Sequence, residues 1–341
     1  MPRLSSLTVA LALAAVASVF LPARVKPANA PAQRSPARVG LVFDVGGRGD
    51  KSFNDSAYEG LSKAAKDLGV YTEVMEPSGA EDREAAMRLF AARGFDLVVG
   101  VGFIFSTDMN IVATAFPKTN FACVDYSPSS DSPIPSNVAG LVFREEEGAF
   151  MVGAVAGLVS KNKGVGFVGG MDVPLIHKFE AGFVAGAKYV CPTCRAHTAY
   201  AGSTPEAFKD PAKGEALATS QISSGADVIF HASGTTGLGV FEAARDMGVY
   251  AIGVDADQHD EMPGVVVTSM IKRVDIVVFD TIQSVLDHRF VGGLHAFGLR
   301  ERGIDYVHDG PHASHIPDNV KVKVAEIRDK IVDGSISVPT K

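Results

Sequence analysis

The sequence predicts an α/β protein of two lobes, in each of which a parallel sheet is wound with helices. From Val39 onward, short β-branched runs alternate with segments whose apolar residues recur at helical spacing. Strict alternation of strand and helix favours a parallel sheet with right-handed crossovers. The alternation starts again after the turn-rich residues 127–136, and 341 residues are enough for two lobes of ordinary size.

The first series of elements is expected to form the N-terminal lobe. Its strands are short apolar runs, and its helices are amphipathic segments that follow each strand. We expect strands over residues 39–45, 70–75, 97–101 and 121–124, and helices over residues 52–68, 80–93 and 106–116.

The second series repeats this pattern. We expect helices over residues 148–159, 175–188, 212–224 and 240–247, and strands over residues 165–168, 196–201, 228–232, 250–254 and 265–270. The chain should leave the first lobe near residues 136–144 and cross back after residues 265–270. The predicted lobes are therefore residues 38–142 with about 270–300, and residues 143–268 with about 301–341.

The first thirty residues have the pattern of a secretory signal peptide. Arg3 supplies a positive charge, residues 7–20 are apolar or small, and Ala28-Asn29-Ala30 fits the small-x-small pattern before a cleavage point. The alternative is a buried or anchoring helix, but the apolar stretch is short for a span and is followed by Pro22 and Pro27. We expect export, with cleavage after about Ala30.

Composition and charge narrow the class of protein. An apolar fraction of 46% and a charged fraction of 21% are typical of a globular chain. Removing the three positive charges of residues 1–30 changes the formal net charge from −7 to −10. Because a strongly acidic protein is repelled by phosphate backbones, we expect no nucleic-acid partner.

The cysteines and histidines leave two metal or redox alternatives open. Cys191 and Cys194 form a CxxC, which suits a redox site or half a zinc site. A small loop disulfide is favoured because the chain is exported and has no second CxxC. The histidines of residues 308–315 could bind a metal, but a Pro/Gly-rich crossover loop is the preferred interpretation, and we expect no metal.

Candidate binding residues follow the predicted strands directly. Ligands of open α/β sheets bind beyond the carboxyl ends of the strands, where acids accept hydrogen bonds from hydroxyls and glycines allow close approach. Three acids and three glycines occupy these positions: Asp44, Asp125, Asp255, Gly102, Gly169 and Gly234. The pattern indicates a cleft for a neutral, hydroxyl-rich molecule.

Glycine-rich segments give no sign of a cofactor. Gly164-x-Gly166-x-x-Gly169 has the form of a dinucleotide fingerprint, but its glycines bracket a strand instead of following it. The segment that begins at Gly234 lacks the Lys-Ser/Thr pair of a phosphate-binding loop, and it is interpreted as a helix N-terminus that faces the cleft. We expect no cofactor.

Aromatic residues at two helix starts point to a planar ligand. Phe53 and the amide of Asn54 begin the first predicted helix, and Phe179 lies near the start of a helix in the second lobe. Two rings from opposite lobes could enclose a purine, and stacking contributes about 1–3 kcal/mol per base. The alternatives are that Ser52 or Asp50 only caps the helix and that Phe179 is a core residue.

Acids and one lysine could contact a sugar. Asp125 and Asp255 could each accept from the two vicinal hydroxyls of a ribose, and Lys272 could neutralise one acid or donate to the sugar. The alternatives are catalytic carboxylates and a solvated lysine. Because no His, Ser or Cys nucleophile accompanies the acids, we expect no enzyme.

These segments resemble a known family, the basic membrane proteins, which are substrate-binding proteins of ABC transporters and include bacterial purine nucleoside receptors. The resemblance is carried by residues 42–44 with 50–54, 167–171 with 178–183, 252–258 and 268–275. It implies a type I periplasmic-binding-protein fold, with two Rossmann-like lobes, three crossovers and hinge closure.

The resemblance also implies roles for individual residues. It implies that Phe53 and Phe179 stack on the purine with Asn54 near the base edge. The same resemblance implies that Asp125, Asp255 and Lys272 contact the ribose and that Asp44 lines the cleft. Many family members are lipoproteins, and this chain has no cysteine near the end of its signal, which implies free diffusion in the periplasm.

The sequence therefore predicts a monomeric periplasmic component of an ABC importer that captures a purine nucleoside, such as adenosine, guanosine or inosine, and delivers it to a membrane permease. An exported nucleoside-cleaving enzyme and a sensor-type binding protein remain alternatives.

Overall fold

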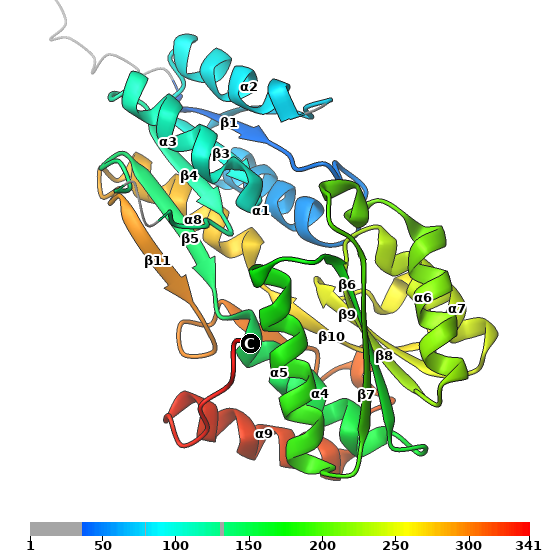
Figure 1. The fold of residues 1–341 in the computed structure, drawn as a ribbon. Helices are drawn as coiled ribbons and strands as arrows, with labels where there is room; N and C mark the ends of the chain where they lie inside the picture. The colour runs from blue at the N-terminus through cyan, green and yellow to red at the C-terminus, as the bar shows by residue number, and fades with distance from the viewer. Residues whose placement is uncertain (1–35, 79, 130–132) are drawn as a thin grey trace, which may run out of the picture. The chain divides into compact units, whose positions relative to one another are not determined.

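The computed structural model describes residues 36–78, 80–129 and 133–341 (Figure 1). The predicted signal peptide, residues 1–30, lies outside the described residues. None of the helices in the described ranges is long and apolar enough to cross a membrane.

Two six-stranded sheets organise the chain. The first has the order β11-β5-β4-β3-β1-β2, and all its strand pairs are parallel. Its strands are β1 (Arg38–Val42), β2 (Tyr71–Met75), β3 (Leu97–Val101), β4 (Asn120–Val124), β5 (Val138–Phe143) and β11 (Gly293–Phe297).

The second sheet has the order β12-β10-β9-β8-β6-β7, and only its edge strand β12 runs antiparallel, against β10. Its strands are β6 (Gly164–Met171), β7 (Arg195–Gly202), β8 (Val228–Ala232), β9 (Tyr250–Asp255), β10 (Val266–Lys272) and β12 (Ile304–Tyr306).

Helices cover both faces of each sheet (Figure 1). In the first sheet, Leu41 packs into one core with α1 (Phe53–Leu68) and α8 (Val274–Leu286), and Val42 packs into another with α2 (Ala80–Ala92) and α3 (Ser106–Ala115). Neighbouring strand residues point to opposite faces, so each strand feeds both cores.

The second sheet is covered in the same way. On one face lie α4 (Glu145–Val159) and α5 (Pro174–Val190), and on the other lie α6 (Pro211–Ser223) and α7 (Thr236–Asp246). The last helix, α9 (Asp318–Val332), packs against α4. Each sheet with its helices is one lobe, and the described chain passes between the lobes after β5, after β10 and after β11. The predicted α/β fold class with two wound lobes and three crossovers is confirmed.

Some elements differ from the sequence prediction. β5 was not predicted, because its six residues lie at the expected breakpoint; in the structure they form an apolar strand that pairs with β4 and β11. The prediction also did not assign α8, α9, β11 and β12. α4 begins at Glu145 rather than at residue 148, and three glutamates in its first turn favour this start by their interaction with the helix dipole.

The small loop disulfide that the sequence favours is present. Cys191 follows the last residue of α5 and forms a disulfide with Cys194. Cys123 lies in β4 and is fully buried, and burial raises the pKa of its thiol.

Glycines allow α4 and α5 to pack in backbone contact, side by side in Figure 1. A Cβ atom on Gly153 would lie 2.1 Å from the Phe183 carbonyl oxygen, and one on Gly186 would lie 2.0 Å from the Phe150 carbonyl oxygen. Since no side chain fits at these distances, the small-residue character of both helices sets their separation.

Replacing Gly186 by alanine should therefore destabilise the fold. Alanine is favoured over glycine in a helix by about 1 kcal/mol, but overpacking against a backbone carbonyl costs about 1–3 kcal/mol or more. We expect G186A to lower the free energy of unfolding in urea, whereas K188A, at an exposed position of the same helix, should leave it nearly unchanged. Equal stabilities of the two variants would contradict this packing.

Candidate functional site

A cavity lies where the carboxyl ends of the two sheets face each other. It is lined by residues from both lobes, and all the candidates predicted from the sequence except Gly169 are among them: Asp44, Phe53, Asn54, Gly102, Asp125, Phe179, Gly234, Asp255 and Lys272. The cavity is also lined by residues that the sequence did not single out for binding, among them Asp50, Phe103, Phe208 and Ser233.

A buried cation links the lobes at this cavity. Lys272 ends β10 in the second lobe, and its Nζ lies 2.7 Å from the carboxylate of Asp125 in the first lobe. A second carboxylate, Glu145 at the start of α4, lies 3.1 Å from the same Nζ. Burial lowers the pKa of Lys272, but the surrounding carboxylates outweigh it and the net direction is upward, so the ammonium is charged.

Glu145 was missed by the sequence analysis. It is fully buried, and its other oxygen accepts from Lys178 Nζ at 3.1 Å. Its place in a run of three glutamates is typical of a solvated helix start, so its sequence context carries no signal for this role.

Three aromatic rings surround the same ammonium. Lys272 Nζ lies 5.1 Å from the ring centre of Phe53, 4.9 Å from that of Phe143 and 5.6 Å from that of Phe179. These are cation–π distances. Phe53 and Phe179, which come from different lobes, therefore both lie beside the same ammonium. Phe179 also packs on Phe230 and so belongs to the core as well.

The acids at the strand ends are held in an apolar environment. Burial raises the pKa of Asp44 to about 7, and it raises the pKa of Asp125 and of Asp255 to about 6. Lys272 opposes the shift at Asp125 and Asp255. At neutral pH these two side chains are carboxylates, while Asp44 is close to its midpoint.

Two of these acids have strained backbones. Asp125 has φ of 59° and Asp255 has φ of 66°, in the left-handed region that non-glycine residues seldom adopt. Such conformations cost about 1–3 kcal/mol each and are typical of functional sites. The chain accepts this cost at the ends of β4 and β9, where it turns both carboxylates into the cavity.

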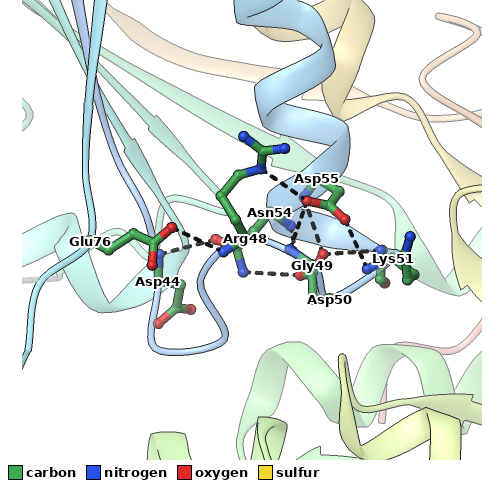
Figure 2. Close-up of polar contacts among 9 residues, drawn as sticks. Asp44, Arg48, Gly49, Asp50, Lys51, Asn54, Asp55 and Glu76 are labelled. Atoms are coloured by element: carbon green, nitrogen blue, oxygen red, sulfur yellow. Dashed lines mark hydrogen bonds and ion pairs between the residues drawn. The ribbon is translucent and has the colours of Figure 1, made fainter.

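The loop between β1 and α1 fixes the amide of Asn54 (Figure 2). Asn54 Oδ1 accepts from the backbone N–H of Asp44 at 3.1 Å, and its Nδ2 donates to Asp50 Oδ2 at 3.0 Å. Asp50 also accepts from the backbone N–H groups of Ser52, Asn54 and Asp55, so Asp50 caps the helix. Because Asn54 has one further N–H and one further lone pair, it can still contact a ligand.

Two histidines and an aspartate lie close enough together to suggest a metal site. Among the described residues, His259, Asp260 and His312 offer ligand atoms within 4.8 Å of one another. The two imidazole rings are stacked 4.4 Å apart at 13°, and imidazole nitrogens bind metals in the plane of the ring, so two parallel rings do not converge on one ion. His312 Nδ1 instead lies 2.6 Å from a carboxylate oxygen of Asp257, and we assign no metal here.

The fold and this interlobe cavity define a two-lobed solute-binding protein. Residues 37–341 match the family described as ABC transporter substrate-binding protein PnrA-like, also called Bmp. The chain therefore belongs to the Bmp family of ABC transporter substrate-binding proteins.

Relatives and solved structures agree with this family. The CD4+ T-cell-stimulating antigen of Listeria monocytogenes is 38% identical over 325 residues, which cover 89% of this chain and 88% of that protein. The ABC transporter nucleoside-binding protein BmpA of Lactococcus lactis is 32% identical over 330 residues, with 90% of both chains covered. A crystal structure of an ABC transporter solute-binding protein from Aeropyrum pernix superposes with a TM-score of 0.80 at 29% identity, covering 90% of this chain and 94% of that one.

The raised pKa of Asp44 predicts a pH dependence of stability. Its pKa is about 7 in the folded protein against 3.8 for an ordinary aspartate, so the folded state binds more protons between these values and stability falls as pH rises. From pH 5 to pH 8, the free energy of unfolding should fall more for the parent protein than for D44N, by on the order of 2 kcal/mol.

The matched control is D67N. Asp67 is exposed, and its hydrogen bond with Lys63 lowers its pKa, so it stays ionised between pH 5 and pH 8. Urea titrations at both pH values should show that the free energy of unfolding falls from pH 5 to pH 8 as much for D67N as for the parent protein, and less for D44N. A fall for D44N as large as that of the parent protein would contradict the raised pKa of Asp44.

Proposed function

We propose that this protein captures a purine nucleoside between its lobes and delivers it to the permease of an ABC importer. The observation that carries the proposal is the position of Phe53 and Phe179, from opposite lobes, beside one buried ammonium and the carboxylates that surround it. A nucleoside has the matching chemistry, with a planar base on one side and a hydroxyl-bearing ribose on the other. The nucleoside-binding relative in Lactococcus supports the same ligand class.

The base would lie against Phe53 and Phe179. Stacking on aromatic side chains contributes about 1–3 kcal/mol per base and tolerates different purines. Asn54 would hydrogen-bond the base edge with its remaining donor and acceptor, because its amide is already oriented by Asp44 and Asp50. Asp44, near its midpoint at neutral pH, could act as donor or acceptor at the same edge.

The ribose would meet the strand-end acids. A hydroxyl both donates and accepts, and the ion pair of Asp125 with Lys272 offers an acceptor and a donor side by side. Asp255 supplies a second carboxylate, which already accepts from the hydroxyl of Ser52. Hydrogen bonds to charged groups contribute about 1.5–3 kcal/mol each, so these side chains favour a nucleoside over a free base.

The cellular setting completes the proposal. We infer that the protein is exported by its N-terminal signal peptide and acts in the periplasm as a monomer. Binding without chemistry is proposed because the family to which the chain belongs is one of substrate-binding proteins.

Calorimetry with inosine, guanosine, adenosine, cytidine and adenine tests the ligand class. We expect tight binding of a purine nucleoside and much weaker binding of cytidine and free adenine. F53A should weaken nucleoside binding by about 10- to 100-fold because it removes one stacking face. F53L, which retains most of the apolar area but has no π face, should fall between F53A and the parent protein.

Three results would overturn the proposal. Binding only of sugars, amino acids or free bases would exclude a nucleoside site. Unchanged affinity in F53A would show that the ligand lies elsewhere. Release of free base during prolonged incubation would identify a nucleoside-cleaving enzyme.

A further inference from the structure

A buried chain of polar groups runs from the cavity to the edge where the lobes touch. It starts at Ser233, which lines the cavity, passes through His231 and Gln258, and ends at the backbone carbonyl of Lys51 in the first lobe. His231 and Gln258 are almost fully buried, and buried polar side chains of this kind are stable only when hydrogen-bonded. The proposed ligand contacts do not use either residue.

The partners of Gln258 fix the orientation of its amide. Its Nε2 lies 3.0 Å from the Lys51 carbonyl oxygen, which can only accept, so this end must be the nitrogen. Its Oε1 then accepts from the Val254 N–H at 2.8 Å and faces His231 Nε2 at 3.0 Å. Its own backbone N–H donates to Ser269 Oγ at 3.0 Å, so both ends of the residue are held.

This orientation of the Gln258 amide fixes which group donates in each hydrogen bond between Ser233 and Lys51. Because Gln258 Oε1 is an acceptor, His231 must donate from Nε2, and its Nδ1 is left as an acceptor. Burial lowers the pKa of His231 to about 4, so the ring is neutral at physiological pH. Ser233 Oγ, 3.3 Å from Nδ1, then donates its proton to the ring and presents its lone pairs to the cavity.

The far end of the chain lies in the loop that shapes the cavity. Lys51 has φ of 55°, a left-handed conformation that costs free energy and must be held by contacts. The next residue, Ser52, donates its hydroxyl to Asp255 in the second lobe. On the other side of Lys51, Asp50 orients Asn54 and caps α1.

We propose that Gln258 and His231 are positioning residues that couple ligand capture to closure of the lobes. The bond from Gln258 to Lys51 joins the two lobes, so separating the lobes would break it, and it holds the loop that presents Phe53 and Asn54. A ligand that contacts Ser233 and this loop at once binds the closed state, and an interaction specific to that state raises its apparent affinity. This inference rests on the proposed function of the cavity, whatever nucleoside it prefers.

The test compares two buried glutamines of the same lobe. Q258M keeps the length of the side chain but cannot bond to Lys51 or His231. Q221M is the matched control, since Gln221 is also buried and donates to a backbone carbonyl, that of Phe167 at 2.8 Å within the second lobe. Both variants should lose folding stability, so loss of stability alone does not distinguish them.

The affinity for inosine and the radius of gyration distinguish Q258M from Q221M. We expect Q258M to bind inosine at least 10-fold more weakly than the parent protein, mainly through faster dissociation, and to have a larger radius of gyration in X-ray scattering without ligand. Q221M should keep the parent radius and an affinity within about twofold. S233A, which removes the cavity end of the chain, should weaken inosine binding by a smaller factor than Q258M.

The outcomes distinguish this inference from the proposed function. If the parent protein binds inosine and Q258M matches Q221M in both affinity and radius, the coupling is wrong while the ligand class stands. If the parent protein binds no nucleoside, the proposed function fails, and the ligand-free radii still decide the coupling: a larger radius for Q258M alone supports it, and equal radii overturn it.

Discussion

The ion pair between Lys272 and Asp125 is the interaction on which the rest of the site depends. It joins the two lobes at 2.7 Å between side chains that are almost fully buried, and Glu145 supplies the second negative charge. Desolvating such charges is costly, and removing one member of a buried pair typically costs about 3–5 kcal/mol. The charges can pair only if the ends of β4 and β10 and the start of α4 are close together, so the pair fixes the relative position of the two lobes.

The surrounding features follow from placing charge in an apolar cavity. Phe53, Phe143 and Phe179 face the ammonium with their rings, which is a favourable arrangement for a cation away from water. The strained backbones of Asp125 and Asp255 bring carboxylates to the strand ends, and Ser52 and Lys272 provide donors for them. A nucleoside would complete this arrangement by supplying hydroxyls to the charges and a flat surface to the rings.

Much of the fold was predictable because alternating strands and helices leave a strong periodic signal. The candidate site was predictable for a related reason, since the carboxyl ends of parallel strands converge, and residues that follow them must lie together. β5 was missed although its residues form an apolar run, because this run lies at the expected breakpoint between the lobes and was assigned to the crossover.

The missed site residues share one property, which is that their roles arise from distant partners. Glu145 has the sequence context of a solvated helix start, and only the packed lobes reveal Lys272 beside it. Gln258 contacts Lys51, 207 residues earlier, and His231, 27 residues earlier. A single sequence gives the residue types at these positions but not the lobe closure that buries them.

The most direct test of the central claim is a crystal structure of the protein with inosine. We expect the base to lie between Phe53 and Phe179, with the ribose hydroxyls within hydrogen-bond distance of Asp125, Asp255 and Lys272. Electron density for inosine outside this cavity, or in it with the ribose turned away from these three side chains, would contradict the account.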